Sequence, residues 1–212
     1  MITLEMQQRM AKLGESLFSR GYSVGGAGNM SARLAGGNVL ATPTNSCLGR
    51  LVPENLSVVG ADGTLLQGAP PTKELPLHLA LYHAKPECRA VVHLHSTYAT
   101  ALSCLAGLDP ADALRPFTPY YVMKIGKLPI IAYYRPGSPE LGRDIAAKAP
   151  SHSAFLLANH GAVVCGANIE DAVNNAEELE ETAKLYFLLL SSGKEVQYLS
   201  GDQIAALRNT QR

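Results

Sequence analysis

Ala90-Val-Val-His-Leu-His95 is a short apolar segment that contains β-branched valines, and this composition predicts a buried strand. In an extended strand, residues i and i+2 project from one face and lie about 6.6 Å apart along the chain. His93 and His95 are therefore expected on one side of this strand. Two imidazoles in this arrangement can bind one metal ion at about 2.0–2.1 Å each. Two ordinary strand histidines with hydrogen-bonded rings are the alternative interpretation.

A third histidine follows a second apolar segment. Ala154-Phe-Leu-Leu-Ala158 predicts another buried strand, and Asn159-His160-Gly161 comes directly after it. The end of a strand, next to a glycine that lets the backbone turn, is where α/β proteins build sites. His93, His95 and His160 together match the three protein ligands of a catalytic zinc, which keeps a fourth position open.

The three other histidines are interpreted as structural. His78 and His83 lie among apolar residues of a helix predicted over 72–84, and His152 lies in a polar loop. These three are therefore left out of the predicted metal site.

The start of the helix predicted over 72–84 is a candidate anion site. Thr72 is expected as its N-cap, and first-turn amides and the helix dipole favour an anion there. Thr72 adds a hydroxyl group and Lys73 a positive charge. Glu74, if it lies near a metal, can act as a general base. An ordinary N-cap followed by polar residues is the alternative, and these residues alone favour it.

Two loops have the character of oxyanion cradles. One is the glycine-rich segment Gly25-Gly-Ala-Gly-Asn-Met-Ser31, which contains Gly28 and Asn29, and the other contains Thr44 and Asn45. Bare backbone amides and small polar side chains suit a phosphate group. The glycine-rich segment is not the dinucleotide fingerprint, because its spacing differs and it follows a helix instead of a strand. A tight turn without a ligand explains it equally well.

The composition excludes several classes of protein. Of 212 residues, 47% are hydrophobic and 17% are charged, which is typical of a globular chain. The 18 basic and 18 acidic residues cancel, so no nucleic-acid or anionic-membrane partner is expected. No apolar run approaches the ~20 residues of a membrane span, and the N-terminus does not resemble a secretory signal. The 4 cysteines are widely spaced, which favours a reducing, cytoplasmic location.

The hydrophobic pattern predicts one α/β domain over residues 1–212, with both hairpin and crossover connections. Ala61-Asp-Gly63 between two apolar runs is a hairpin signal. The expected helices cover 6–20, 72–84, 98–105, 140–149, 169–191 and 200–208, and the expected strands 38–42, 57–60, 64–66, 90–95, 129–134, 154–158 and 162–165.

Taken in order along the chain, these pieces resemble the class II aldolase/adducin family over about residues 5–205. The motifs that carry the resemblance are Gly28-Asn29-x-Ser31, Thr42-Pro43-Thr44, Thr72-Lys73-Glu74, Val91-Val92-His93-x-His95, Asn159-His160-Gly161 and Glu177-Glu178-Leu179-Glu180. Each motif is weak alone, whereas the ordered set is specific. Within the family, 41–49, 93–104 and 115–120 look most like the 3-oxo-tetronate 4-phosphate decarboxylase branch.

The resemblance implies a single-domain α/β/α sandwich around a mixed, largely antiparallel sheet, assembled as a homotetramer with sites at subunit interfaces. It implies a zinc ion, or another divalent cation, on His93, His95 and His160. Glu74 matches a carboxylate that serves in acid/base catalysis and can also coordinate the metal. The positions that match substrate-phosphate ligands are Gly28, Asn29, Thr44, Asn45, Thr72 and Lys73.

A catalytic tyrosine and two departures complete the comparison with the family. Tyr120 matches a tyrosine that acts as an acid in family aldolases, and Tyr121 is its neighbouring competitor. Fuculose-phosphate aldolases have two serines where this chain has Thr72 and Lys73, and a common glycine is Asn45 here. We hypothesise that the added charge of Lys73 suits a substrate with a carboxylate as well as a phosphate.

The implied function is zinc-dependent decarboxylation of a 3-oxo-tetronate 4-phosphate to dihydroxyacetone phosphate and CO2, through a metal-stabilised enediolate. An aldolase or epimerase acting on a fuculose- or ribulose-type phosphosugar is the alternative, because an aldolase needs the same enediolate. A non-catalytic, adducin-like scaffold is a further alternative, and the presence of all three histidines and Glu74 argues against it.

Overall fold

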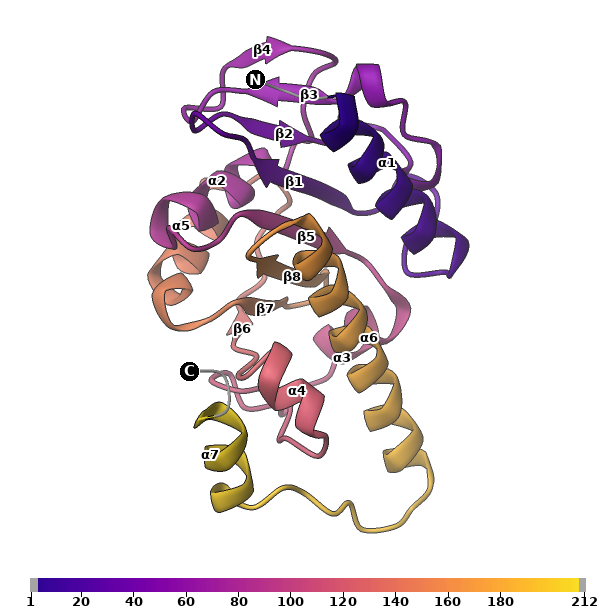
Figure 1. The fold of residues 1–212 in the computed structure, drawn as a ribbon. Coiled ribbons are helices and arrows are strands. Elements are labelled where there is room, and N and C mark those ends of the chain that lie inside the picture. Colours follow the sequence, from indigo (N-terminus) through magenta and orange to yellow (C-terminus); the bar gives the residue numbers. More distant parts are fainter. Residues whose placement is uncertain (1–3, 210–212) are drawn as a thin grey trace.

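The computed structural model describes residues 4–209 and contains one sheet of eight strands, flanked by helices on both faces (Figure 1). The strands are β1 Asn29–Arg33, β2 Val39–Ala41, β3 Ser57–Val59, β4 Leu65–Gln67, β5 Ala90–Leu94, β6 Ile130–Ile131, β7 Ala154–Leu157 and β8 Gly161–Gly166. Their order in the sheet is β4-β3-β2-β1-β5-β8-β7-β6. Only β6 and β7 pair in parallel among the described strands.

The described residues also form seven α-helices and three short 3-10 turns, which precede, connect or follow these strands. The helices are α1 Leu4–Ser19, α2 Leu75–Ala84, α3 Thr97–Ser103, α4 Pro119–Lys124, α5 Pro139–Lys148, α6 Ile169–Ser191 and α7 Gly201–Asn209. The 3-10 turns are Leu48–Arg50, Pro53–Asn55 and Ala149–Ser151. Among the described residues, no helix combines the length and the apolar character that a membrane span requires.

The two faces of the sheet pack against different helices. Helices α1, α3 and α6 cover one face, and α2 and α5 cover the other (Figure 1). Alternation along β5 assigns its side chains: Ala90, Val92 and Leu94 enter the first core, whereas Val91 enters the second. His93 shares the face of Val91, so it points toward the side of the sheet that α2 covers.

The predicted fold class is confirmed: the sheet is mixed and largely antiparallel, with helices on both faces. The helix over 169–191, the hairpin around Ala61-Asp-Gly63 and the strand carrying His93 are also present. The single-domain prediction for 1–212 includes the ends of the chain outside the described residues, and it stays a prediction.

Four local predictions were wrong. The glycine-rich segment was expected to be a loop throughout, but strand β1 begins at Asn29, because the backbone pairs with β5 from Asn29 and also with β2 from Ser31. The strand predicted over 129–134 is reduced to Ile130–Ile131. The short helix α4 was not predicted at all. Finally, α2 begins at Leu75 with Glu74 as its N-cap, not at Thr72. This start puts Pro76 in the first helical turn, where its missing N–H costs nothing.

Candidate metal centre and substrate pocket

Four potential metal ligands meet at the carboxyl end of β5. The strand carries His93, the residue after it supplies His95, the β7–β8 turn supplies His160, and the N-cap of α2 supplies Glu74. One ligating atom from each residue lies within 4.8 Å of all the others. The three imidazole rings pack edge to face, with centroids 4.7 to 4.8 Å apart.

The tight β7–β8 turn brings His160 against the end of β5. Asn159 has a positive φ of 56°, and Gly161 has a φ of 149°. A Cβ atom at Gly161 would lie only 2.4 Å from the carbonyl oxygen of Leu94, so no other residue fits without moving the backbone. The glycine after the histidine therefore allows the close approach of the two chain segments.

The four side chains have the chemistry that a divalent metal requires. The Nδ1–H of His93 donates to the carbonyl oxygen of Ala162 at 2.9 Å, so the lone pair of this ring is on Nε2, which lies 2.9 Å from Nε2 of His95. Glu74 Oε2 lies 3.3 Å from His93 Nε2. Glu74 Oε1 is buried, lies 3.5 Å from His160 Nε2, and makes no hydrogen bond with any described residue. Three imidazoles and a carboxylate fit zinc or a similar cation.

Burial sets the charge of this cluster. Burial, together with smaller contributions from the neighbouring His93 and His160, lowers the pKa of His95 to about 4. Burial also lowers the pKa of His160. Burial raises the pKa of Glu74, but the neighbouring His93 and the hydrogen bond from Asn29 outweigh it, so this pKa lies well below its usual range. At neutral pH, His95, His160 and Glu74 therefore have the protonation states in which they bind a metal.

A cavity of about 210 Å³ opens beside Glu74 and His95. All six residues predicted to hold a phosphate line it: Gly28, Asn29, Thr44, Asn45, Thr72 and Lys73. Sequence reasoning missed Pro43, Ser46 and Pro136, which also line it. The structure thus brings the predicted residues together next to the metal-ligand cluster, and their binding of phosphate stays a prediction.

Two backbone positions explain how the cavity wall is shaped. Gly28 has a φ of 83°, and a Cβ there would lie 3.0 Å from the carbonyl oxygen of His93. Asn45, which replaces a common family glycine, has a φ of 57°. Asparagine tolerates this left-handed region better than most residues do. Asparagine therefore suits the conformation of the loop at this position.

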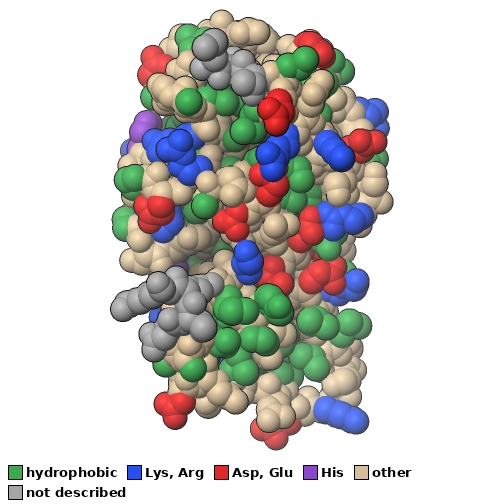
Figure 2. All heavy atoms as spheres, viewed as in Figure 1, with side chains coloured by type: hydrophobic (Ala, Val, Ile, Leu, Met, Phe, Trp, Pro, Cys, Tyr) green, Lys and Arg blue, Asp and Glu red, His purple; other side chains and the backbone are tan. Residues whose placement is uncertain are grey.

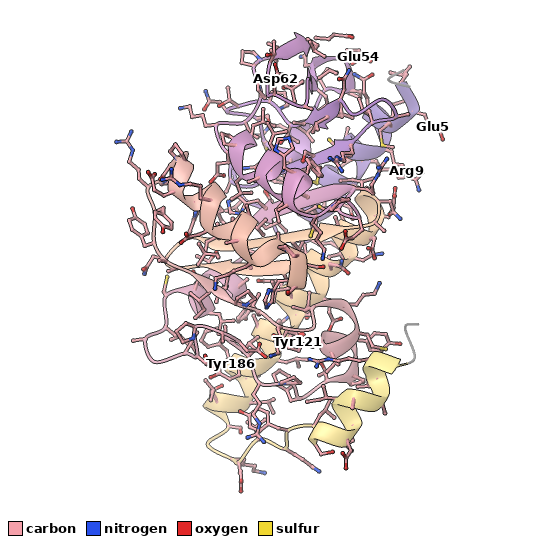
Figure 3. The ribbon with its side chains drawn as sticks, turned by 90° about the vertical axis from the view of Figure 1, so that its left-hand side faces the viewer. Glu5, Arg9, Glu54, Asp62, Tyr121 and Tyr186 are labelled. Atoms are coloured by element: carbon pink, nitrogen blue, oxygen red, sulfur yellow. The ribbon has the colours of Figure 1, made fainter. Side chains whose placement is uncertain are left out.

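The two candidate tyrosines lie outside this cavity. Tyr120 on α4 is 62% exposed, whereas Tyr121 is 1% exposed and packs in the core beneath α4, in the lower part of Figure 3. Burial raises the pKa of Tyr121 well above its usual value. Of the two, only Tyr120 is exposed enough to reach a substrate, and it does not line the cavity of its own subunit.

A buried carboxylate that the sequence marked only as part of an acidic helix fixes the segment after His95. Glu180 on α6 accepts hydrogen bonds from Ser96 Oγ at 2.6 Å, from the N–H of Tyr98 at 2.8 Å and from the N–H of Ala99 at 2.7 Å. It therefore satisfies the free amides at the start of α3. The chain that carries His95 is held on both sides, by β5 and by this cap.

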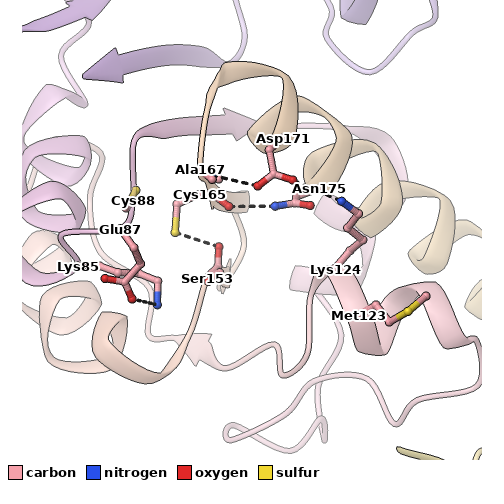
Figure 4. A pocket seen from close by; sticks show the side chains of 11 residues that line it. Lys85, Glu87, Cys88, Met123, Lys124, Ser153, Cys165, Ala167, Asp171 and Asn175 are labelled. Carbon is pink, nitrogen blue, oxygen red and sulfur yellow. Dashed lines mark hydrogen bonds and ion pairs between the residues drawn. The ribbon is translucent and has the colours of Figure 1, made fainter. Parts of the chain in front are cut away.

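A second cavity, of about 300 Å³, lies at the opposite end of β5 and β8 (Figure 4). Cys88, Cys165 and Asn175 are among the residues that line it, and none of the predicted site residues does. The two cavities therefore differ in their lining, since only the first is lined by predicted metal ligands, Glu74 and His95, and by the loops predicted to bind an anion.

Comparison with known proteins identifies the family. The class II aldolase and adducin N-terminal domain family matches residues 8–187, and the chain belongs to this family. It is 54% identical over 209 residues to the 3-oxo-tetronate 4-phosphate decarboxylase of Haemophilus influenzae, covering 99% of each chain. It is 34% identical to the L-fuculose phosphate aldolase of the same organism, over 94% of this chain and 90% of the aldolase. The crystal structure of YgbL from Escherichia coli superposes with a TM-score of 0.94, at 53% identity, over 97% of this chain and 98% of YgbL.

These relatives confirm the predicted family and its decarboxylase branch. They also confirm the prediction of an enzyme, a carbon–carbon lyase. The cluster of one glutamate and three histidines in a class II aldolase fold indicates a divalent metal site.

Proposed function

We propose that the protein is a zinc-dependent 3-oxo-tetronate 4-phosphate decarboxylase that forms dihydroxyacetone phosphate and CO2. One observation carries the proposal. Two proteins of Haemophilus influenzae are relatives, and the chain is 54% identical to the decarboxylase but only 34% identical to the fuculose phosphate aldolase. Both relatives are compared over nearly the whole chain, so the higher identity to the decarboxylase supports the decarboxylase branch over the aldolase branch.

The cavity beside Glu74 is proposed to bind the phosphate end of the substrate. Backbone amides of Gly28 and Asn45 and the side chains of Thr44 and Thr72 are the proposed ligands, and Lys73 adds a positive charge. Binding energy from this end would orient the reacting carbons, which lie toward the histidine cluster.

The reaction breaks the bond between C1 and C2 and releases C1 as CO2. The bonding electron pair stays at C2 as an enediolate, and a proton added at C2 completes dihydroxyacetone phosphate. A bound zinc would supply Lewis-acid stabilisation of this negative charge. Glu74 is ionised at rest and has one unpartnered oxygen, so it is the proposed group that takes up a proton from water and delivers it to C2.

A homotetramer with sites between subunits is also proposed. Tyr120 is exposed and lies outside its own cavity, so as an acid it would act in the site of a neighbouring copy. Hydrophobic side chains gather on the lower part of the face in Figure 2, and Leu185, Leu188 and Leu190 near the end of α6 are 42%, 56% and 48% exposed. An apolar patch of this kind is typical of an association surface.

The cytoplasm is the proposed location, which the widely spaced cysteines favour.

The test is a comparison of kcat/KM for 3-oxo-tetronate 4-phosphate with kcat/KM for L-fuculose 1-phosphate and a ribulose phosphate, on one zinc-loaded preparation. The proposal predicts a preference for the acid of at least about 10³-fold, because a sugar phosphate leaves polar groups that serve the carboxylate without a partner. A preference for aldol cleavage or for epimerisation would move the enzyme to the other branch and keep the metal site.

A further inference from the structure

Behind Glu74, strand β1 and helix α2 face each other with matched polar residues. Asn29 and Ser31 are two apart on β1, so they share the face that α2 covers. His78 and Tyr82 are four apart on α2, so they share the helix face toward the strand. The two residues of each pair are about 6–7 Å apart along their element, in the strand as in the helix. The side chains of the two pairs can therefore alternate in one hydrogen-bonded chain.

These four side chains form a continuous hydrogen-bonded chain that ends on Glu74. The Tyr82 hydroxyl lies 2.7 Å from Ser31 Oγ, and Ser31 Oγ lies 2.7 Å from His78 Nδ1. His78 Nε2 lies 2.6 Å from Asn29 Oδ1, and Asn29 Nδ2 donates to Glu74 Oε2 at 2.8 Å. The side chains are buried: Ser31 and His78 are 0% exposed, Tyr82 is 2% and Asn29 is 6%.

The direction of each hydrogen bond follows from the groups at the two ends. Glu74 Oε2 accepts, so the amide nitrogen of Asn29 faces it and the amide oxygen faces His78. His78 must then carry its proton on Nε2, and its Nδ1 accepts from the Ser31 hydroxyl. Ser31 in turn accepts from the hydroxyl group of Tyr82. The reverse direction would put two acceptor oxygens 2.8 Å apart at Glu74.

We propose that His78 is a positioning residue: as the neutral Nε2–H tautomer, it fixes the amide of Asn29 and thereby the orientation of Glu74 at the metal centre. Ser31 and Tyr82 fix the tautomer of His78 in turn. The inference deepens the proposed function, on which it rests, by assigning roles to residues outside the substrate pocket. It also reassigns His78, which sequence reasoning treated as structural only.

The surroundings of His78 favour the neutral ring. Burial, with a smaller contribution from the neighbouring His93, lowers the pKa of His78 to about 3. Burial also raises the pKa of Tyr82 well above its usual value, so its hydroxyl group stays a donor. Arg33 lies over the ring of Tyr82, 5.3 Å from its centroid, and helps to hold that end of the chain.

As a consequence of this hydrogen-bonded chain, the two oxygens of Glu74 have different roles. Oε2 receives the Asn29 N–H, whereas Oε1 makes no hydrogen bond with any described residue. The chain therefore holds one oxygen in place and leaves the other for metal or proton. A substitution that lets the Asn29 amide rotate would disturb both functions without touching a ligand.

A direct test measures the tautomer in the zinc-loaded protein. Long-range ¹H–¹⁵N NMR of the histidine rings, with the His78 signals assigned by their absence from His78→Gln, distinguishes Nε2–H, Nδ1–H and the charged ring. The neutral Nε2–H form from pH 5 to pH 8 is expected. An Nδ1–H or charged ring would overturn the proposal. The measurement is made on the wild-type protein, and His78→Gln is needed only to assign the signals.

A paired substitution separates positioning from packing. Glutamine can place an N–H where Nε2 lies, whereas the shorter asparagine cannot. We expect His78→Asn to weaken zinc binding and to lower kcat by about tenfold or more. His78→Gln should stay within about threefold of wild type for both. His83→Gln, an exposed histidine on the same helix, is the matched control.

Zinc affinity is measured by chelator competition, and the visible spectrum of the cobalt-loaded protein reports the ligand geometry. Equal zinc affinity and kcat for His78→Asn and wild type, or equally defective Gln and Asn variants that both fold, would overturn the inference. If the protein does not decarboxylate 3-oxo-tetronate 4-phosphate but zinc affinity still follows the Gln and Asn order, the proposed function fails and the inference stands.

Discussion

The metal-ligand cluster and the buried chain behind it use similar residues in opposite ways. In the cluster, imidazoles of His93, His95 and His160 converge on a carboxylate, and Glu74 Oε1 has no hydrogen-bond partner among the described residues. In the chain, His78 uses both ring nitrogens in hydrogen bonds to protein groups.

The difference shows how to distinguish a ligand site from its support. Buried polar atoms normally have hydrogen-bond partners. A cluster of converging polar side chains that includes an unpartnered oxygen is therefore typical of a ligand site. A buried polar chain in which every atom is paired stabilises one geometry instead. By this criterion, a buried histidine beside a metal centre is assigned by the partners of its two nitrogens, not by its distance from the metal.

The largest expected effect comes from removing a ligand. His93→Ala should abolish stoichiometric zinc binding and lower kcat by at least about 10³-fold, because the Lewis acid is worth several kcal/mol of barrier. Metal analysis and turnover on the same preparation check this. His83→Ala should keep both, and a zinc-free His93→Ala protein with substantial turnover would contradict the metal role.

The next effect concerns Tyr120, the proposed acid, which lies outside the cavity. Tyr120→Phe should lower kcat by about 10²-fold, the usual contribution of a general acid, and should leave zinc content unchanged. If Tyr120 acts across subunits, mixed oligomers of Tyr120→Phe and His93→Ala should be more active than either variant alone. Unchanged turnover in Tyr120→Phe would remove this residue from the mechanism.

Lys73 tests the substrate end of the pocket. Lys73→Ser should raise KM for an acidic phosphorylated substrate about tenfold more than KM for a neutral phosphosugar, because a second anionic group loses its cation. Steady-state kinetics with both substrates measure the ratio. Equal changes in the two KM values would contradict the proposed role in carboxylate recognition.

The smallest expected effect is the contribution of His78 to the pH dependence of folding stability. The pKa of His78 is about 3 in the folded protein and about 6.5 in an unfolded chain, so below pH 6.5 only the unfolded state takes up the proton. Stability should therefore fall between pH 6.5 and pH 3, by up to about 1.4 kcal/mol per pH unit for this residue. Urea unfolding of metal-free wild type and His78→Gln measures it. Identical slopes in the two proteins would contradict a neutral, buried His78.

Local sequence patterns predicted those parts of the site that depend on local geometry. The strand spacing of His93 and His95 and the glycine after His160 are features of neighbouring residues, and the resemblance to the family joined them to Glu74. The structure brings all four together. The six predicted phosphate-binding residues likewise line one cavity.

The missed features depend on long-range contacts. Asn29 was predicted to lie in a loop because no neighbouring residue indicates its pairing with His93 of β5. His78 was read as a core residue because its partners lie 47 and 49 positions away along the chain. The role of Glu180 depends on amides more than 80 residues distant. The sequence did contain a signal for this hydrogen-bonded chain: positions 29 and 31 have the spacing of one strand face, and positions 78 and 82 have the spacing of one helix face. That these two faces meet is known only from the fold.

The most direct test of the central claim follows the carboxylate of the substrate. The zinc-loaded protein would be given 3-oxo-tetronate 4-phosphate labelled with ¹³C at C1, with ¹³C NMR of the products. The account predicts one labelled CO2 for each dihydroxyacetone phosphate, with turnover stopped by a chelator and restored by zinc. A label that stays in a carboxylate, or release that continues unchanged without metal, would contradict it.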